Sequence, residues 1–547
     1  MTVAERLAAA DAAANAIALL LQATDWDAGL LVDEAGASFQ SGGGADIIRV
    51  TSNDTEGRTG WGDDRVLIEG DRNALWAGPG DDAVLAVGSG NSLWGGVGND
   101  ILVAGSAIIG PDIAGSTAWG GAGDDIIFLL GNGNTAHAGP GHDIVAAGSH
   151  STVWANAGDD VVVLTGSDTT VHDGLGDDIV RVTGSRNTVS GGPGADVIIV
   201  QGGGTSQENT VHGGAGDDVL EVRGARTTAH GGLGDDSFLV TLEGYISTLN
   251  GGQGDNRFTF DFGALDALTL GSLPVELVAE LQQALTARTV VKAFGGAGND
   301  VFVGGVLGAT LHGGPGDDLF DLSSALSTTI IAGIGNDEIR IQDGRQVTVQ
   351  AGAGDDLVVF SGLAGLVYGG NGDDDLTIGG DFNVAFGGNG ADRLVAQHGG
   401  TNFLVGGRGQ DELITLSSGT TYLVFESVRD SSNSAASADV IRGFTPGRDA
   451  LFLGGIAAEA GFVFDPATMT SGFVFSGVGP LQGIAGEVSV VMLNDTDAWV
   501  LIDVDGDGQA DSSIILADVQ AEALSAEDVG TFAVSFADAF LSILPVG

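Results

Sequence analysis

The chain has no cysteine among its 547 residues, so it can form no disulfide framework and perform no thiol chemistry. Long apolar runs are missing too. No stretch approaches the roughly 18 consecutive apolar residues that a membrane-spanning helix needs. The sequence therefore predicts a protein without a transmembrane segment, and one whose fold needs a staple other than disulfides.

Basic residues are scarce: 19 Lys and Arg stand against 73 Asp and Glu, for a formal net charge of −54. This balance excludes a general nucleic-acid binder and argues against anionic membranes as direct partners. Such acidity is also typical of disordered or halophilic chains. The hydrophobic content of 43% and the regular placement of the acidic residues favour a folded chain instead.

A six-residue phrase repeats from Ser41 to Asp411, as in Gly-Gly-Pro-Gly-Ala-Asp (191–196) and Gly-Gly-Ala-Gly-Asp-Asp (213–218). Nineteen copies align, and ten of the eighteen intervals between them are 18 residues. A period this short predicts a solenoid in which each repeat forms one coil. Position six is Asn256 in one copy and aspartate in the others: Asp46, Asp64, Asp82, Asp100, Asp125, Asp143, Asp160, Asp178, Asp196, Asp218, Asp236, Asp300, Asp318, Asp337, Asp356, Asp374, Asp392 and Asp411.

The residues after each phrase alternate between apolar and polar, as in Ile179-Val180-Arg181-Val182, which indicates a strand. A second short strand follows a turn, as in residues 187–190. Two strands and two turns in about 18 residues make a flattened parallel β-coil, and such coils stack about 4.8 Å apart.

Stacking brings the position-six carboxylates close together, which creates an electrostatic problem. Two charges about 5 Å apart repel by roughly 3 kcal/mol at an effective dielectric of 20, and by about 1 kcal/mol in water. Summed over the column, this exceeds the ~5–15 kcal/mol stability of an ordinary fold. Cations are therefore expected between the turns. Carboxylates and glycine-rich turn carbonyls are hard oxygen ligands in flexible number, which suits Ca²⁺ better than Mg²⁺.

The phrase and the strand after it resemble the nonapeptide of RTX (repeats-in-toxin, haemolysin-type) calcium-binding proteins. The resemblance covers about two thirds of the chain. It implies a parallel β-roll that folds on Ca²⁺ outside the cell after export by a type I secretion system. In the usual RTX roll both turns of a coil carry the nonapeptide, whereas here only one does. At the other turn an Asn/Thr/Ser hydrogen-bond ladder is expected in place of calcium: Asn73, Asn91, Asn134, Ser151, Thr169, Asn187, Asn209 and Thr227.

Two further columns follow the repeat. Position five carries Asp in many copies, and we interpret it mostly as solvated surface charge. The position before each phrase is rich in Trp and His, for example Trp76, Trp94 and His137. Two main interpretations stay open for this column: a stacking ladder along the coils, or a flat platform for sugar rings or a partner. Histidine as a metal ligand is a weaker third, because no carboxylate is paired with each histidine at ligand spacing.

Beyond the coils, residues 1–24 read as a helix that covers an open solenoid end, and Leu273–Ala287 reads as an inserted helix. Residues 439–451 resemble the strand-turn-strand that commonly closes RTX rolls. Asp503, Asp505, Asp507 and Asp511 then match the start of an EF-hand-type calcium loop, although Ile514 stands where the bidentate Glu is expected. The apolar end, Val529–Gly547, resembles a C-terminal type I secretion signal.

The predicted fold is all-β: a parallel β-roll or β-helix solenoid with a helical N-terminal cap, a helical insertion and a β-rich C-terminal cap. Five segments are expected. Residues 1–40 form the N-terminal cap, 41–262 and 293–416 form the two calcium-binding solenoid parts, 263–292 form the insertion, and 417–547 form the C-terminal capping and secretion-signal region.

The predicted function is that of a secreted, calcium-binding structural or adhesive protein at the cell surface or in a matrix or surface layer. The expected partners are multiple Ca²⁺ ions, with cell-surface polysaccharide or self-assembly as further possibilities. An enzyme is not expected, because neither His-Glu-x-x-His nor Gly-x-Ser-x-Gly occurs and no coil departs from the pattern in a way that marks an active site. A polysaccharide-active lyase or epimerase, or a glycan-binding module, remains the alternative.

Overall fold

The computed structural model describes residues 2–23, 29–105, 115–201, 208–241, 246–261, 291–459 and 473–529. These residues fall into two compact units, the first within 2–261 and the second within 291–529. None of the helices in the described ranges is both long and apolar enough to cross a membrane.

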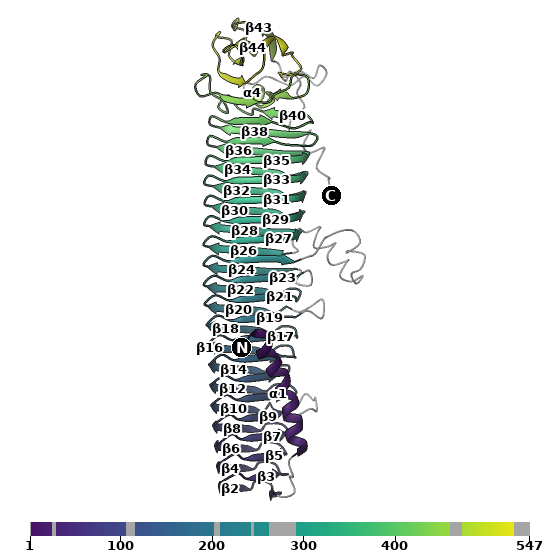
Figure 1. Cartoon of the computed structure of the whole chain (residues 1–547), viewed down its shortest axis with the longest axis vertical. Helices are drawn as coiled ribbons and strands as arrows, with labels where there is room; N and C mark the ends of the chain where they lie inside the picture. Colours follow the sequence, from purple (N-terminus) through teal and green to yellow (C-terminus); the bar gives the residue numbers. More distant parts are fainter. Residues whose placement is uncertain are drawn as a thin grey trace. The chain divides into compact units, whose positions relative to one another are not determined.

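The first unit is a parallel β-solenoid in which every coil contributes one strand to each of two faces (Figure 1). Strands pair with their equivalents in the next coil in register, so that Val161 lies beside Ile179 and Val162 beside Val180. Side chains alternate along each strand. In the strand Arg65–Glu69, Val66 and Ile68 are buried, while the two end residues face solvent.

The strands of this unit form two stacks. One face consists of β1 (Leu30–Val32), β3 (Ile47–Val50), β5 (Arg65–Glu69), β7 (Ala83–Val87), β9 (Ile101–Gly105), β11 (Ile126–Leu130), β13 (Ile144–Ala147), β15 (Val161–Leu164), β17 (Ile179–Val182), β19 (Val197–Val200), β21 (Val219–Val222), β23 (Ser237–Thr241) and β25 (Arg257–Asp261). The other consists of β2 (Ser38–Gly43), β4 (Glu56–Trp61), β6 (Ala74–Pro79), β8 (Ser92–Val97), β10 (Thr117–Ala122), β12 (Thr135–Pro140), β14 (Thr152–Ala157), β16 (Thr170–Leu175), β18 (Thr188–Pro193), β20 (Thr210–Ala215), β22 (Thr228–Leu233) and β24 (Ser247–Gln253).

The second unit is built from the same type of coil. One face holds β27 (Val301–Leu307), β29 (Leu319–Leu326), β31 (Glu338–Arg345), β33 (Leu357–Leu363), β35 (Asp375–Asp381), β37 (Arg393–Ala396), β39 (Glu412–Thr415) and β41 (Asp439–Arg442). The other holds β26 (Val291–Ala297), β28 (Ala309–Pro315), β30 (Thr329–Ile334), β32 (Thr348–Ala353), β34 (Leu366–Asn371), β36 (Asn383–Asn389), β38 (Asn402–Arg408), β40 (Thr421–Val424) and β42 (Ala450–Phe452).

The second unit ends in a β-rich segment. The helix α4 (Gly454–Glu459) follows β42, and β43 (Val474–Val478) pairs in parallel with β44 (Glu487–Met492). Strands β44, β45 (Ala498–Asp503) and β46 (Ser512–Leu516) are antiparallel, and β46 also pairs with β41. A 3₁₀ turn, η3 (Ala521–Ala523), comes after β46.

The turns opposite the glycine-rich edge are held by buried side-chain hydrogen bonds, as predicted. The N–H of Thr169 donates to Oδ1 of Asn187 at 2.9 Å, and Asn187 Nδ2 donates to the carbonyl of Gly166 at 3.0 Å. The N–H of Asn73 donates in the same way to Oδ1 of Asn91. These side-chain oxygens accept backbone N–H groups of the preceding coil, which is the ladder that the sequence predicts.

The helix α1 (Val3–Ala23) confirms the expected helix but not its expected position. Its side chains Val3, Leu7 and Ala10 pack on the lateral face formed by β15 and β17, and Arg181 binds Asp11 across the contact at 2.8 Å (Figure 1). The described part of α1 therefore covers an apolar strand face rather than an open coil end. The apolar stripe of a helix shows that it must be buried, but not against which surface.

The all-β parallel solenoid predicted from the sequence is thus confirmed. The helix expected at Leu273–Ala287 and the secretion signal expected at residues 530–547 lie outside the described ranges.

Candidate metal-binding edge

Glycine makes the repeated turn possible, because neighbouring coils approach too closely for a side chain. In the copy that ends at Asp100, Gly96 and Gly98 have φ values of 125° and 133°, a region that other residues rarely adopt. A Cβ added to Gly96 would lie 2.1 Å from the carbonyl oxygen of Gly78 in the preceding coil. The turns therefore stack backbone on backbone, with the position-six carboxylates alongside.

One oxygen of the position-six carboxylates joins successive coils. Oδ1 of Asp218 accepts the N–H of Asp196 at 2.8 Å, and the N–H of Asp218 donates to Oδ1 of Asp236 at 3.0 Å. The same link runs through the column. In each unit it makes the aspartates a continuous, buried ladder.

The other oxygen has no partner and faces further acceptors. Oδ2 of Asp196 is buried without a hydrogen bond among the described residues. A Cβ added to Gly191 would lie 2.2 Å from this Oδ2 and 2.7 Å from the carbonyl oxygen of Gly213, so both oxygens border one small space. Two acceptors that face each other in a buried space need a cation or a proton between them.

The same unpartnered, buried Oδ2 recurs along both units. It is found at Asp46, Asp64, Asp82, Asp100, Asp125, Asp143, Asp160, Asp178, Asp196, Asp218, Asp236, Asp318, Asp337, Asp356, Asp374, Asp392, Asp411 and Asp439. Asp300 occupies the equivalent place, and its N–H donates to Oδ1 of Asp318 at 2.8 Å. The structure thus places all eighteen predicted position-six aspartates on the ladder.

Asp439 is a further member that the sequence interpretation missed. Its Oδ1 accepts the N–H of Asp411 at 3.0 Å, although 28 residues separate the two. No glycine-rich phrase precedes it, because Ala435–Ala438 take that place. The signal was the strand after it, since Asp439-Val440-Ile441-Arg442 has the same pattern as Asp178–Arg181.

Without a bound cation, the electrostatics of the ladder disfavour ionised carboxylates. Burial raises the pKa of Asp100 and Asp160 to about 8, and the pKa of Asp218 to about 7. In each case the N–H donated by the preceding aspartate lowers the pKa, and neighbouring carboxylates raise it further. Burial likewise raises the pKa of Asp236 to about 6. A cation in the turns would offset this cost at neutral pH.

Asn256 shows how a coil is satisfied when the charge is absent. Its Oδ1 accepts the N–H of Asp236 at 3.0 Å, as an aspartate would. Its Nδ2 then stands in the place of Oδ2 and donates to the carbonyl of Gly254 at 3.0 Å. The amide donor of Asn256 therefore satisfies its turn without a cation, whereas an ionised aspartate has no such donor. This contrast implies that the aspartate turns are built to hold a cation.

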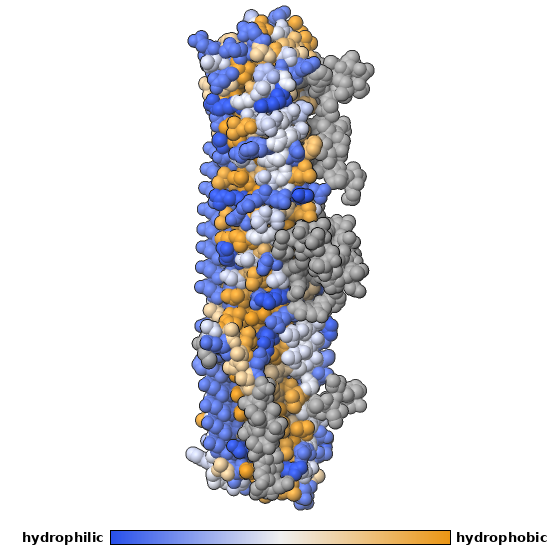
Figure 2. All heavy atoms as spheres, turned by 45° about the vertical axis from the view of Figure 1, so that its right-hand side comes forward, coloured by the Kyte–Doolittle hydropathy of each residue, from blue (hydrophilic) through white to orange (hydrophobic). Residues whose placement is uncertain are grey.

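Position five is exposed, as expected, and its side chains also join successive coils. Oδ1 of Asp217 accepts the N–H of Asp235 at 2.9 Å, and Oδ1 of Asp177 accepts the N–H of Ala195 at 2.9 Å. His142 makes the same contact through Nδ1, with the N–H of Asp159 at 2.9 Å. Sequence alone could not show this second ladder, since it depends on how turns of successive coils align. Hydrophilic residues consequently line this edge of the coils (Figure 2, left margin).

A separate acidic group forms in the loop between β45 and β46. Carboxylate oxygens of Asp503, Asp505 and Asp511 lie within 4.8 Å of one another. Asp507, predicted with them, is not part of this group: its oxygens accept from the N–H and Nε2 of Gln509. Asp503 also accepts from the N–H groups of Gly506 and Gly508, which fixes the loop.

The aromatic column forms a stacked ladder. The rings of Trp76 and Trp94, and those of Trp94 and Trp119, stack with centroids 4.5 Å apart. Stacking covers the ring faces that a sugar would need, so the geometry favours the ladder interpretation. The stack ends under Arg58, whose guanidinium carbon lies 4.8 Å from the Trp76 ring centroid.

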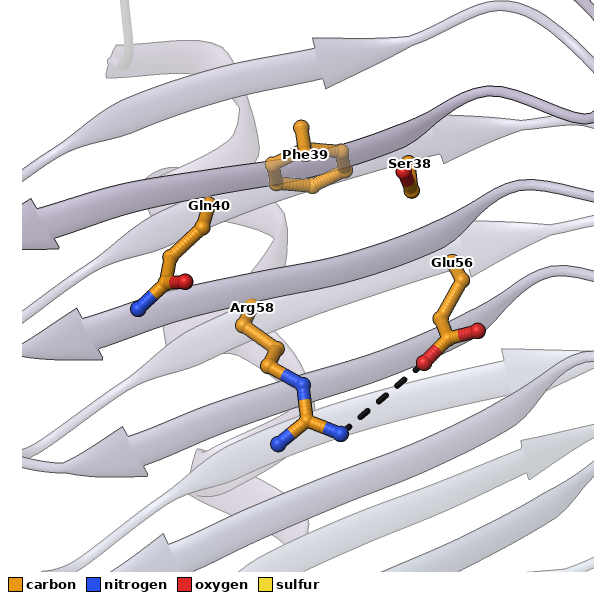
Figure 3. Close-up of a pocket in the computed structure, with 5 residues that line it drawn as sticks. All are labelled: Ser38, Phe39, Gln40, Glu56 and Arg58. Carbon is orange, nitrogen blue, oxygen red and sulfur yellow. Dashed lines mark ion pairs between the residues drawn. The ribbon is translucent and has the colours of Figure 1, made fainter.

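Arg58 also borders a shallow hollow of about 280 Å³ on the face of β2 and β4, with Ser38, Phe39, Gln40 and Glu56 (Figure 3). Arg58 and Glu56 form an ion pair at 3.8 Å there. This hollow contains no pair of carboxylates, and its charged groups are occupied with each other and with the ladder.

The described coils define a class of protein: a parallel β-solenoid with one edge lined by buried carboxylates and turn carbonyls that together fit Ca²⁺. A family model described as RTX calcium-binding nonapeptide repeat (4 copies) matches residues 76–107, 119–150, 172–204, 203–238 and 292–306. These segments of the chain therefore carry RTX calcium-binding nonapeptide repeats, the resemblance predicted from the sequence.

Among solved structures, the chain is similar to a hyperactive, Ca²⁺-dependent, β-helical antifreeze protein from an Antarctic bacterium (20% identity over 54% of this chain and 78% of that chain, TM-score 0.33). It is also similar to the AlgE6R3 and AlgE6R2 subunits of the Azotobacter vinelandii mannuronan C5-epimerase. Both are 26% identical. The first match covers 30% of this chain and 82% of that chain at a TM-score of 0.22, and the second covers 32% and 92% at 0.20. No curated protein gives a significant match.

A matched pair of substitutions tests the role of position six. Asp218→Asn and Asp217→Asn remove the same charge from adjacent residues, one buried at 1% exposure and one exposed. Both amides keep an oxygen for the backbone N–H. Asp218→Asn is expected to lower the number of bound Ca²⁺ ions and to cost about 2–3 kcal/mol of stability at a calcium concentration about 100-fold above the dissociation constant.

Asp217→Asn is expected to leave the ion count unchanged and to alter stability by less than about 0.5 kcal/mol. Metal analysis of desalted protein and thermal unfolding in calcium give the two readouts. Equal losses in the two variants would show that position six is not the ligand.

Proposed function

We propose that this chain is a secreted protein that folds on Ca²⁺ outside the cell and serves a structural or adhesive role at the cell surface or in a matrix. The observation that carries the proposal is the buried Oδ2 that recurs in both units and that faces a turn carbonyl oxygen, as at Asp196 beside Gly213 and at Asp318 beside Ala332. In this proposal the position-six aspartates hold the ions between successive turns. Bound Ca²⁺ supplies the positive charge that lets these buried carboxylates stay ionised.

Asp503, Asp505 and Asp511 are proposed to hold one further ion in the C-terminal segment, without Asp507. Their spacing within 4.8 Å and the backbone N–H groups that orient Asp503 support this. The ion would tie the loop after β45 to the strands that close the second unit. A missing Glu at the twelfth position leaves room for solvent ligands.

Export would precede folding in this proposal. A chain of net charge −54 that needs millimolar calcium can stay unfolded where free calcium is scarce and fold where it is plentiful. The RTX repeats support an extracellular location. The exposed position-five carboxylates next to the ion row give the folded protein an acidic edge that divalent cations can bridge to another acidic surface.

Assembly of the calcium-loaded protein tests the structural role against the enzyme alternative. Light scattering and electron microscopy should show sheets, fibres or clusters in millimolar Ca²⁺, but not in NaCl of the same ionic strength. Beads that carry an acidic polysaccharide should retain the protein in calcium more strongly than neutral dextran beads. A calcium-loaded monomer that binds neither its own copies nor polysaccharide, or that depolymerises or epimerises a polysaccharide, would contradict the proposal.

A further inference from the structure

One turn departs from the repeat at position one. Asp173 stands there, whereas every other copy has glycine, alanine, serine or threonine at this position. Asp173 belongs to the same turn as Asp178, within the regular run of the first unit. The sequence interpretation passed over this departure because it leaves the period and position six intact.

A position-one side chain points toward the space that the unpartnered Oδ2 borders. In the copies with glycine, an added Cβ would nearly touch Oδ2 of position six; the distance is 2.1 Å between such a Cβ on Gly213 and Oδ2 of Asp218. Where the residue carries a hydroxyl, it donates to the carbonyl of the next coil: Ser41 Oγ to Thr59 and Thr59 Oγ1 to Ala77, both at 2.6 Å. An ionised aspartate has no proton to donate there.

Asp173 is fully buried, at 0% exposure, and neither of its oxygens has a hydrogen-bond partner in the described structure. A carboxylate oxygen of each of Asp160, Asp173 and Asp178 lies within 4.8 Å of the other two. Oδ2 of Asp160 and Oδ2 of Asp178 are also buried without a partner. Within the described coils, this is the turn at which a third carboxylate joins two position-six carboxylates.

The neighbouring basic group only partly balances this charge. Arg6 of α1 donates to the carbonyl oxygens of Asp177 and Asp160, both at 2.7 Å, and so lies beside the turn without binding a carboxylate. One guanidinium against three carboxylates leaves the cluster two charges negative. Removing such charge from water is costly unless a cation is coordinated.

We propose that Asp160, Asp173 and Asp178 form a three-carboxylate cation site, distinct from the two-carboxylate sites of the ion row, which takes a hard divalent or trivalent cation and fills first. Additional ligand charge raises the affinity of oxygen sites for such cations, and a buried, hydrogen-bonded turn is rigid. This inference rests on the proposed calcium row, because Asp160 and Asp178 are members of it.

Europium(III) luminescence on the full-length chain can resolve this site. The position of the narrow ⁷F₀→⁵D₀ excitation line depends on the summed charge of the ligands, so a three-carboxylate site gives its own line. At less than one equivalent of Eu³⁺, the wild type should show this single line, with an affinity at least tenfold above that of later equivalents. Asp173→Asn should lose the line and the tight phase.

Asp177→Asn is the matched control, because it removes one charge from the same turn at an exposed side chain. This variant should keep both the excitation line and the tight binding phase. Asp173→Gly restores the glycine of other copies, and so provides a second variant that suits the turn backbone. If the first equivalent of Eu³⁺ gave the same excitation line and the same affinity in both Asp173 variants as in the wild type, the inference would be overturned. The proposed calcium row would still stand. If the wild type bound neither Eu³⁺ nor Ca²⁺, the proposed calcium row itself would be wrong.

Discussion

In excess chelator at pH 8, the chain should lose most of its β-structure, and millimolar Ca²⁺ should restore it. Each aspartate of the ladder leaves one ionised oxygen buried against carbonyl oxygens, as at Asp196 beside Gly213. An unpaired buried charge costs several kcal/mol even after relaxation. A column of such charges outweighs the ~5–15 kcal/mol that stabilises an ordinary fold.

Far-UV circular dichroism and small-angle scattering measure this transition directly. Magnesium at the same concentration is the control, because Mg²⁺ demands a rigid octahedron and gives up its water reluctantly, so it should restore little structure. A chelated sample that keeps its full β-spectrum and compact radius at pH 8 would refute calcium-dependent folding.

The sequence predicted those features that a local pattern specifies. Glycine at fixed spacing and the alternating strand after Asp178 were enough to predict the coil, and the stacked carboxylates were enough to predict cations. The ladder that contains Asn187 was also predictable, because Asn, Ser or Thr recurs at this turn in successive coils. Each of these inferences needs only the period and the chemistry of one residue type.

What the sequence could not predict depends on how distant segments meet. The position of α1 on β15 and β17 depends on which strands present apolar side chains on their outer face. The hydrogen bond that the N–H of Ala195 donates to Asp177 depends on turn alignment between coils. Asp507 matched a loop pattern, yet its carboxylate turned toward Gln509 because that local bond competes with the ligand position.

The pH dependence of the metal-free chain should be opposite to that of an ordinary acidic protein. Burial raises the pKa of ladder aspartates from an unfolded value of 3.8 to about 8 at Asp100 and about 7 at Asp82 and Asp143. Between these values the folded state binds more protons than the unfolded state. The free energy of unfolding therefore falls as the pH rises.

The stabilisation from these protons is fully present below pH 3.8 and is lost as the pH rises through about 6–8. In chelator, lowering the pH from 8 to 5 should therefore recover β-structure, because a proton on Oδ2 can donate to the facing carbonyl as the amide of Asn256 does. The lower limit of pH 5 stays above the isoelectric point of about 4.1, where association would confuse the signal.

Calcium should remove this dependence. Ca²⁺ binds only the deprotonated carboxylates, so between pH 8 and 6 the calcium-loaded chain and the unfolded chain both bind almost no protons, and stability in saturating calcium should hardly change with pH. The calcium midpoint of folding should fall as the pH falls from 8 to 6, because protons already stabilise part of the ladder. Titrations followed by circular dichroism at several pH values give both trends from one sample. A metal-free chain that gains no β-structure at pH 5, or a calcium midpoint that does not change with pH, would mean that the Oδ2 atoms are not the groups that calcium neutralises.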